Sequence, residues 1–106
     1  MNMTPSIIER VTAVLRDAAR PSRIILFGSH ARGNARADSD LDILVVERGQ
    51  PNRVEEMVRL RRLLSPLRVP VDLLVIGEES FREQGAVPGN YLHEAATEGR
   101  VLFESA

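Results

Sequence analysis

The sequence of 106 residues contains no cysteine, no lysine and no tryptophan. Without cysteine the chain cannot form disulfides, thiol nucleophiles or cysteine-ligated zinc and iron–sulfur sites. All fourteen basic residues are arginine, so mechanisms that need a Walker lysine, a Schiff-base lysine or a kinase-type phosphate lysine are excluded. The apolar runs are much shorter than the ~20 residues of a membrane span, and the N-terminus lacks a signal-peptide pattern. We therefore expect a cytoplasmic protein with no membrane association.

What the composition does provide is typical of one folded unit. The hydrophobic fraction of 43% and the charged fraction of 27% favour an ordinary globular protein over a disordered or fibrous chain. A chain of this length normally forms one core, so we expect a single domain over residues 1–106. The net charge of −1 gives no basic excess, and direct nucleic-acid binding is not expected.

Apolar periodicity and turn residues predict the order α-β-loop-β-α-β-α-α-β, in which the loop from Gly28 to Ser39 has room for one helical turn. This order is typical of an α/β or α+β domain with a small mixed sheet flanked by helices. Thr4 is the expected cap of the first helix, and the apolar side of the second is expected to include Val54, Met57 and Leu60. The predicted elements are a helix from Pro5 to about Arg20, strands 23–27 and 41–46, a helix over 54–67, a strand over 71–76, helices over 79–84 and 91–96, and a strand over 101–103.

Three aspartates interrupt the apolar strands. Asp40 and Asp42 are two residues apart, so their carboxylates point to the same side of an extended strand. Asp72 begins a strand that could pair beside theirs. Three clustered carboxylates repel one another, and without lysine the compensating charge must come from arginine or a divalent cation. An all-oxygen set suits Mg²⁺ better than zinc, whereas the alternative is that these are solvated residues at strand ends.

A small polar loop, Phe27 to Gly33, follows the first strand. Gly28 permits a sharp turn or a close backbone approach, and Ser29 offers a hydroxyl where backbone N–H groups would favour a phosphate. The segment matches neither the hydrolase G-x-S-x-G elbow nor the G-x-G-x-x-G and Gly-Lys phosphate loops. Taken alone, it could also be a plain turn.

The loop and the aspartates join in one pattern: Gly28-Ser29, ten residues, then Asp40-Leu41-Asp42. GSHARGNARADSDLDILVV resembles the signature of the minimal nucleotidyltransferases of the DNA polymerase β-like superfamily. VDLLVI resembles the strand that carries their third carboxylate, and the resemblance covers roughly residues 5–104. It implies a polymerase β-like nucleotidyltransferase fold. Chains of this type resemble antitoxins paired with an all-helical HEPN toxin, which move AMP from ATP onto a toxin tyrosine.

The resemblance also implies roles for single residues. Asp40 and Asp42 would hold the magnesium that bridges the nucleotide phosphates. Asp72 would complete a second metal site and help deprotonate the acceptor hydroxyl. Gly28 and Ser29 would contact the triphosphate. Two divalent ions agree with the chemistry of in-line phosphoryl transfer, in which both the attacking and the leaving oxygen carry negative charge.

Other polar residues of the loop have weaker assignments. Arg32 and Arg36 could offset the charge of the leaving pyrophosphate, or they could serve solubility or an ion pair with Asp38. His30 is expected to be a non-catalytic loop residue. Tyr91 is expected to be core or interface, with self-modification as the alternative. No residue stands out as a reader of the nucleotide base.

Three functions remain open at this point. The first is a Mg²⁺-dependent nucleotidyltransferase that modifies a macromolecular hydroxyl, with the partner protein expected to position the acceptor. The second is an antitoxin that neutralises its partner by binding alone, with vestigial catalysis. The third, a small-molecule (antibiotic) nucleotidyltransferase, fits less well because such enzymes resemble this core plus a further domain. The intact aspartate set favours the first, since an unused cluster would carry its electrostatic cost without benefit.

Overall fold

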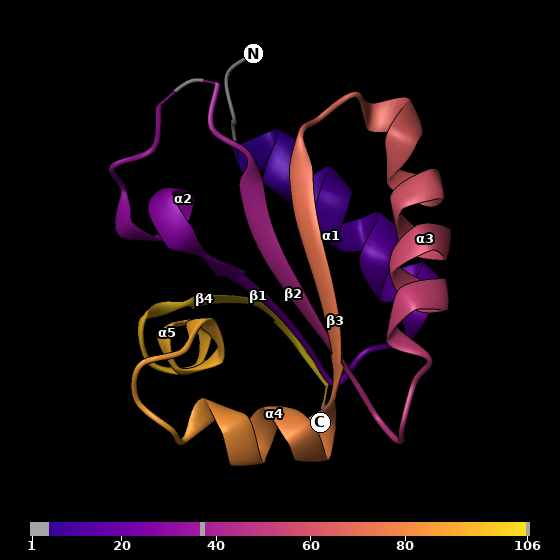
Figure 1. Cartoon of the computed structure of the whole chain (residues 1–106). Coiled ribbons are helices and arrows are strands. Elements are labelled where there is room, and N and C mark those ends of the chain that lie inside the picture. Colours follow the sequence, from indigo (N-terminus) through magenta and orange to yellow (C-terminus); the bar gives the residue numbers. More distant parts are fainter. Residues whose placement is uncertain (1–4, 37, 106) are drawn as a thin grey trace.

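The computed structural model describes residues 5–36 and 38–105, so Thr4, the expected helix cap, lies outside the described residues. Four strands form one sheet with helices packed on both of its faces (Figure 1). The fold class predicted from the sequence is confirmed. The elements are α1 (Pro5–Ala19), β1 (Arg23–Phe27), α2 (Gly28–Arg32), β2 (Leu41–Glu47), α3 (Arg53–Leu64), a 3₁₀ turn (Ser65–Leu67), β3 (Val71–Gly77), α4 (Glu78–Gly85), α5 (Tyr91–Glu98) and β4 (Arg100–Glu104).

The sheet has the strand order β3-β2-β1-β4 and is mixed. β1 runs antiparallel to both β2 and β4, which are its neighbours. β2 and β3 are parallel, because α3 carries the chain back between them. β3 is therefore an edge strand, and its first residues lie beside the first residues of β2.

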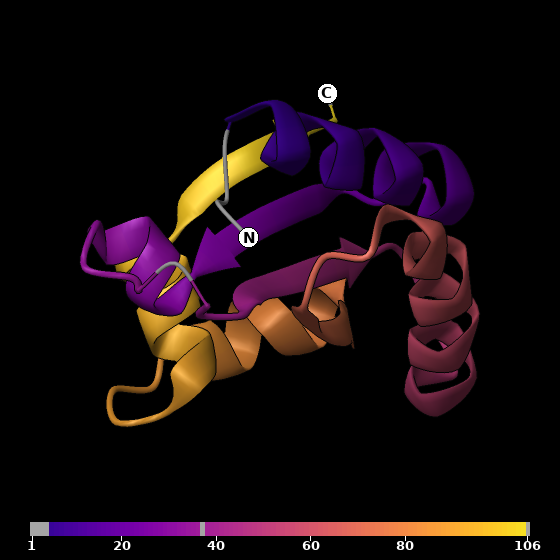
Figure 2. The same ribbon diagram turned by 90° about the horizontal axis from the view of Figure 1, so that it is seen from above.

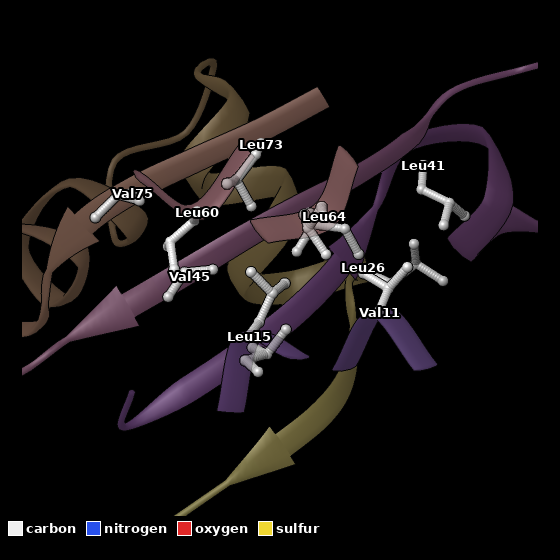
Figure 3. Close-up of a cluster of buried hydrophobic side chains, with 11 residues drawn as sticks. Val11, Leu15, Leu26, Leu41, Val45, Leu60, Leu64, Leu73 and Val75 are labelled. Atoms are coloured by element: carbon white, nitrogen blue, oxygen red, sulfur yellow. The ribbon is translucent and has the colours of Figure 1, made fainter. Parts of the chain in front are cut away.

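Side chains that alternate along the strands divide the core into two clusters. α1 lies on one side of the sheet, and α4 and α5 lie on the other (Figure 2). Leu41, Ile43 and Val45 face α1 and α3, whereas Leu44 and Val46 face α4 and α5. Burial on both faces explains why these strands read as nearly continuous apolar runs. The larger cluster, drawn in Figure 3, contains Val11, Leu15, Ile24, Leu26, Leu41, Ile43, Val45, Leu60, Leu64, Leu73 and Val75.

The apolar side predicted for the second helix is wrong at one position. Val54, in the first turn of α3, is 67% exposed, whereas Leu60 and Leu64 are buried. Asn52 caps the helix by accepting a hydrogen bond from the N–H of Glu55. This cap sets the start of α3, and Val54 in the first turn faces solvent. Within the described part of the chain, no helix combines the length and apolar character that crossing a membrane requires.

A buried carboxyl lies at the end of β2, away from the aspartates. Glu47 is 8% exposed, and burial together with its hydrogen bond to Glu56 raises the pKa of Glu47 to about 8. Glu56 is itself held by Arg59, whose Nε lies 2.7 Å from Oε1, and this contact lowers the pKa of Glu56. At neutral pH the neutral Glu47 therefore donates to the ionised Glu56.

We expect Glu47→Gln to remove part of the pH dependence of folding. The folded protein keeps the Glu47 proton up to about pH 8, but the unfolded chain releases it near pH 4.5. The free energy of unfolding therefore falls as pH rises between these values. Glutamine has no proton to lose and can still donate to Glu56. Urea unfolding at about pH 5 and about pH 9 should show the variant gaining on the wild type at the higher pH. Parallel pH profiles would contradict the assignment.

Candidate active site

The three sequence-predicted aspartates lie at the end of the sheet where β2 and β3 begin. Asp42 and Asp72 are direct partners in the parallel register, so their side chains leave the same face of the sheet. Asp40 immediately precedes β2. Asp42 is half-buried, whereas Asp40 and Asp72 are exposed. The fold thus brings together carboxylates that are thirty positions apart in the chain.

The pKa of Asp42 depends on burial and on the two neighbouring aspartates. Burial raises the pKa of Asp42, and the negative charges of Asp72 and Asp40 raise it further. His30 acts in the opposite direction, and Glu94 adds a smaller increase. The half-buried carboxylate is therefore held among like charges, a situation that a cation relieves.

Gly28 is the backbone neighbour of this carboxylate. It follows Phe27, which pairs with Asp42 across β1 and β2, and its φ of +72° lies in the left-handed region. A Cβ placed on Gly28 would overlap Oδ2 of Asp42. The position therefore requires glycine for two reasons, the backbone conformation and the space. Both the turn and the close approach expected from the sequence are present.

The short helix α2 anchors the loop that leads to Asp40. Gly33 ends the helix with a φ of +78°, and its N–H donates to the carbonyl of Ser29. The ring Nε2 of His30 lies 3.0 Å from the carbonyl oxygen of Ser39, the residue before Asp40. The N–H of Arg36 donates to the hydroxyl of Ser39. His30 thus connects α2 to the start of β2.

The arginines near the site differ in their contacts. Arg32 forms an ion pair with Glu94 of α5. Arg36 is exposed and, among the described residues, forms no ion pair with Asp38. Arg61 was missed by the sequence analysis: its Nη2 donates to the carbonyl of Leu73 at 3.4 Å and lies 3.9 Å from Oδ1 of Asp72. Because β3 is an edge strand, α3 can send this side chain around the sheet, and no sequence signal indicates that contact.

The donors at this end of the sheet fit a hard divalent cation in kind. They are carboxylate oxygens, and the negative charges of Asp72 and Asp40 add to the effect of burial in raising the pKa of Asp42. As the side chains lie, no three acidic or imidazole groups of the described residues converge into a complete ligand set. Asp72 lies toward Arg61, and its side chain is 56% exposed. In the sheet, Asp72 remains the register partner of Asp42 on the adjacent strand.

Comparison with known proteins agrees with this geometry. Residues 8–102 match the nucleotidyltransferase domain family. A protein of Methanocaldococcus jannaschii, named as a candidate protein adenylyltransferase, is 34% identical over 104 residues, which cover 97% of this chain and all of that protein. The solved structure of a candidate minimal nucleotidyltransferase is 32% identical, with a TM-score of 0.62 over 94% of this chain and 95% of that one.

A second solved structure has the same fold. It is a toxin–antitoxin with AMP-PNP, 25% identical, with a TM-score of 0.63 over 92% of this chain and 73% of the matched chain. The family match spans nearly all of the sheet, and it includes all three aspartates and the Gly28-Ser29 turn. The chain therefore belongs to the nucleotidyltransferase domain family, as a minimal nucleotidyltransferase of the DNA polymerase β-like superfamily.

Proposed function

We propose that the chain transfers AMP from ATP to a tyrosine hydroxyl of a HEPN toxin partner in a Mg²⁺-dependent reaction. The observation that carries this proposal is the pairing of Asp42 with Asp72 on one face, beside a glycine that leaves room for the Asp42 carboxylate. Support for a protein acceptor comes from the candidate adenylyltransferase relative. Support for a toxin partner and for ATP comes from the toxin–antitoxin structure with AMP-PNP.

The reaction forms a bond between the acceptor oxygen and the α-phosphorus, and it breaks the bond to the bridging oxygen, so that pyrophosphate leaves. Asp40, Asp42 and Asp72 would hold two Mg²⁺ ions, which neutralise charge on the attacking and leaving oxygens. Asp72 would accept the proton of the acceptor hydroxyl, since its carboxylate is exposed at the sheet edge. Asp42 is less exposed and serves as the fixed point of the site.

The loop after β1 would bind the triphosphate. Gly28 and Ser29 present backbone at the carboxylate end of the sheet, next to Asp42. Arg36 is exposed and could reach the leaving pyrophosphate. Arg32 would act from beside α5, where its ion pair with Glu94 holds it. These two arginines would offset negative charge as the pyrophosphate departs.

A folded partner is the acceptor that this arrangement suits. Asp40 and Asp72 are exposed, so the acceptor hydroxyl can arrive from solvent on the surface of another macromolecule. Holding two reacting groups in line can supply on the order of 7–11 kcal/mol of the barrier. A docked protein can provide that orientation, whereas a free tyrosine cannot.

We expect the folded HEPN partner to gain AMP readily and a short tyrosine peptide to be a very poor substrate. Mass spectrometry after incubation with Mg-ATP measures the transfer, and addition of EDTA should abolish it. A partner that gains no nucleotide, while an aminoglycoside or a free nucleotide does, would show that the acceptor is a small molecule.

We expect Asp42→Asn to stabilise the isolated protein slightly while removing activity. Because the folded-state pKa of Asp42 is raised, ionisation of this carboxyl lowers the free energy of unfolding as pH rises through that pKa. Asparagine does not ionise, so the variant avoids this loss. The gain at neutral pH should stay below about 1 kcal/mol, since solvent screens the group. The rate of AMP transfer should fall by a larger factor than in variants of a residue that only supports a metal ligand, which typically lose roughly 10–100-fold. Thermal unfolding without metal and the transfer assay measure the two effects.

The double variant Asp40→Ala, Asp42→Ala separates catalysis from binding. If chemistry is required, the double variant should still form the complex with the toxin and fail to protect cells from it. Full protection by this variant would instead show that the antitoxin acts by binding alone.

A pair of glycine variants tests the space beside Asp42. Gly28→Ala and Gly33→Ala both place a side chain at positive φ, which costs about 1–2 kcal/mol in each case. A Cβ at Gly33 meets nothing within 4 Å, whereas a Cβ at Gly28 would displace the Asp42 carboxylate. Both variants should therefore lose stability in urea unfolding, but only Gly28→Ala should also lose transfer. Equal activity in the two variants would contradict the close approach.

A further inference from the structure

Tyr91 is the only tyrosine of the chain, and it lies at the start of α5. Its ring packs against that of Phe27, with the ring centroids 6.5 Å apart and the planes inclined by 31°. Phe27 is 7% exposed, but Tyr91 is 42% exposed. One aromatic ring is thus fixed in the core and supports a second ring that remains open to solvent. The core position expected for Tyr91 is therefore wrong, whereas the interface position, expected as its equal, stays a prediction.

The exposed ring lies close to the aspartates. Phe27 is the register partner of Asp42 across β1 and β2, and side chains that face each other in an antiparallel pair have Cβ atoms about 4.5–5.5 Å apart. The ring of Phe27 therefore links the two residues: it packs against Tyr91 and lies beside Asp42 in the sheet. Gly28, the first residue of the proposed triphosphate loop, follows Phe27 directly.

An independent contact places the first turn of α5 beside α2, the short helix that begins at Gly28. Glu94 lies one helical turn after Tyr91. The same Glu94 holds Arg32 of α2 in an ion pair. Asn90 fixes the start of the helix, since its side chain accepts from the N–H of His93 and donates to the carbonyls of Gln84 and Val87. Tyr91 thus stands on a well-anchored helix start.

We propose that the exposed face of Tyr91, backed by Phe27, is the surface on which the nucleotide base stacks. The assignment rests on the proposed function, because it places the base beside a triphosphate bound at Gly28 and Asp42. Stacking on an aromatic ring tolerates every base, since each has a π-face, and larger rings overlap more. Tyr91 therefore favours purine nucleotides over pyrimidine nucleotides and discriminates little between ATP and GTP.

The test compares two ligands that differ in the base. Mg-ATP carries the base and the triphosphate, whereas Mg-tripolyphosphate carries the phosphates alone. Calorimetric titration of the wild type, Tyr91→Phe, Tyr91→Leu and Tyr91→Ala with both ligands separates the two contributions. Val87→Ala, at an exposed apolar residue of the preceding loop, is the matched surface control.

Loss of the ring should weaken Mg-ATP binding at least about fivefold, while Mg-tripolyphosphate binding stays unchanged. Tyr91→Phe keeps the ring and should bind as the wild type does, and so should Val87→Ala. Tyr91→Leu keeps an apolar contact with Phe27, so it reports on stacking even if Tyr91→Ala folds poorly. In the transfer assay the leucine variant should show a raised KM for ATP and little change in kcat.

Three results would overturn the stacking role. They are unchanged Mg-ATP binding in the leucine variant, an equal loss for both ligands, and a loss in Tyr91→Phe as large as that in Tyr91→Leu. The last result would assign the effect to the hydroxyl, as self-modification of Tyr91 requires. A wild type that binds Mg-ATP but modifies no partner would contradict only the proposed function, and one that binds neither ligand would contradict both.

Discussion

Repulsion among like charges at one end of the sheet is the constraint on which the rest of the site depends. The parallel register of β2 and β3 sets Asp42 beside Asp72, and Asp40 adds a third carboxylate one step earlier. Within a protein this costs several kcal/mol unless a positive charge approaches. The cluster is tolerated because Asp40 and Asp72 remain in contact with water, and Arg61 reaches Asp72 around the edge strand. Of the three, only Asp42 is partly withdrawn from solvent. Its pKa is therefore raised, first by burial and then by the charges of Asp72 and Asp40.

The apolar core holds the strands in register, and so it keeps the three carboxylates close together despite their repulsion. Both faces of β2 are covered, one by α1 and α3 and the other by α4 and α5. A shift of one residue in the register would move Asp42 to the opposite face of the sheet, into the apolar cluster that Leu41, Ile43 and Val45 now fill. The apolar packing thus fixes where the carboxylates lie, and the polar residues contribute little to that choice.

Short-range contacts then build the walls of the site around Asp42. Gly28 lets the backbone pass against the carboxylate, His30 connects α2 to the residue before Asp40, and Glu94 joins α5 to α2 through Arg32. The loop after β1, the start of β2 and the distant helix α5 therefore meet at one point. At the opposite end of β2, a buried carboxyl is accommodated in a different way. Glu47 keeps its proton near neutral pH and therefore adds no negative charge.

The sequence by itself determined the fold class and the strand positions, and it indicated the aspartates and the Gly28-Ser29 turn as candidate site residues. Local signals were sufficient for these: short, nearly continuous apolar runs, breaks at glycine and proline, and the fixed spacing from Gly28-Ser29 to Asp40-Leu41-Asp42. Tertiary structure alone decided that Val54 is exposed, that Arg61 meets Asp72, and that Tyr91 stands beside Phe27. The two contacts join segments that sheet order and helix docking bring together, and the exposure of Val54 depends on what packs against α3. Periodicity reports which side of an element is apolar, but it does not report what lies across from it.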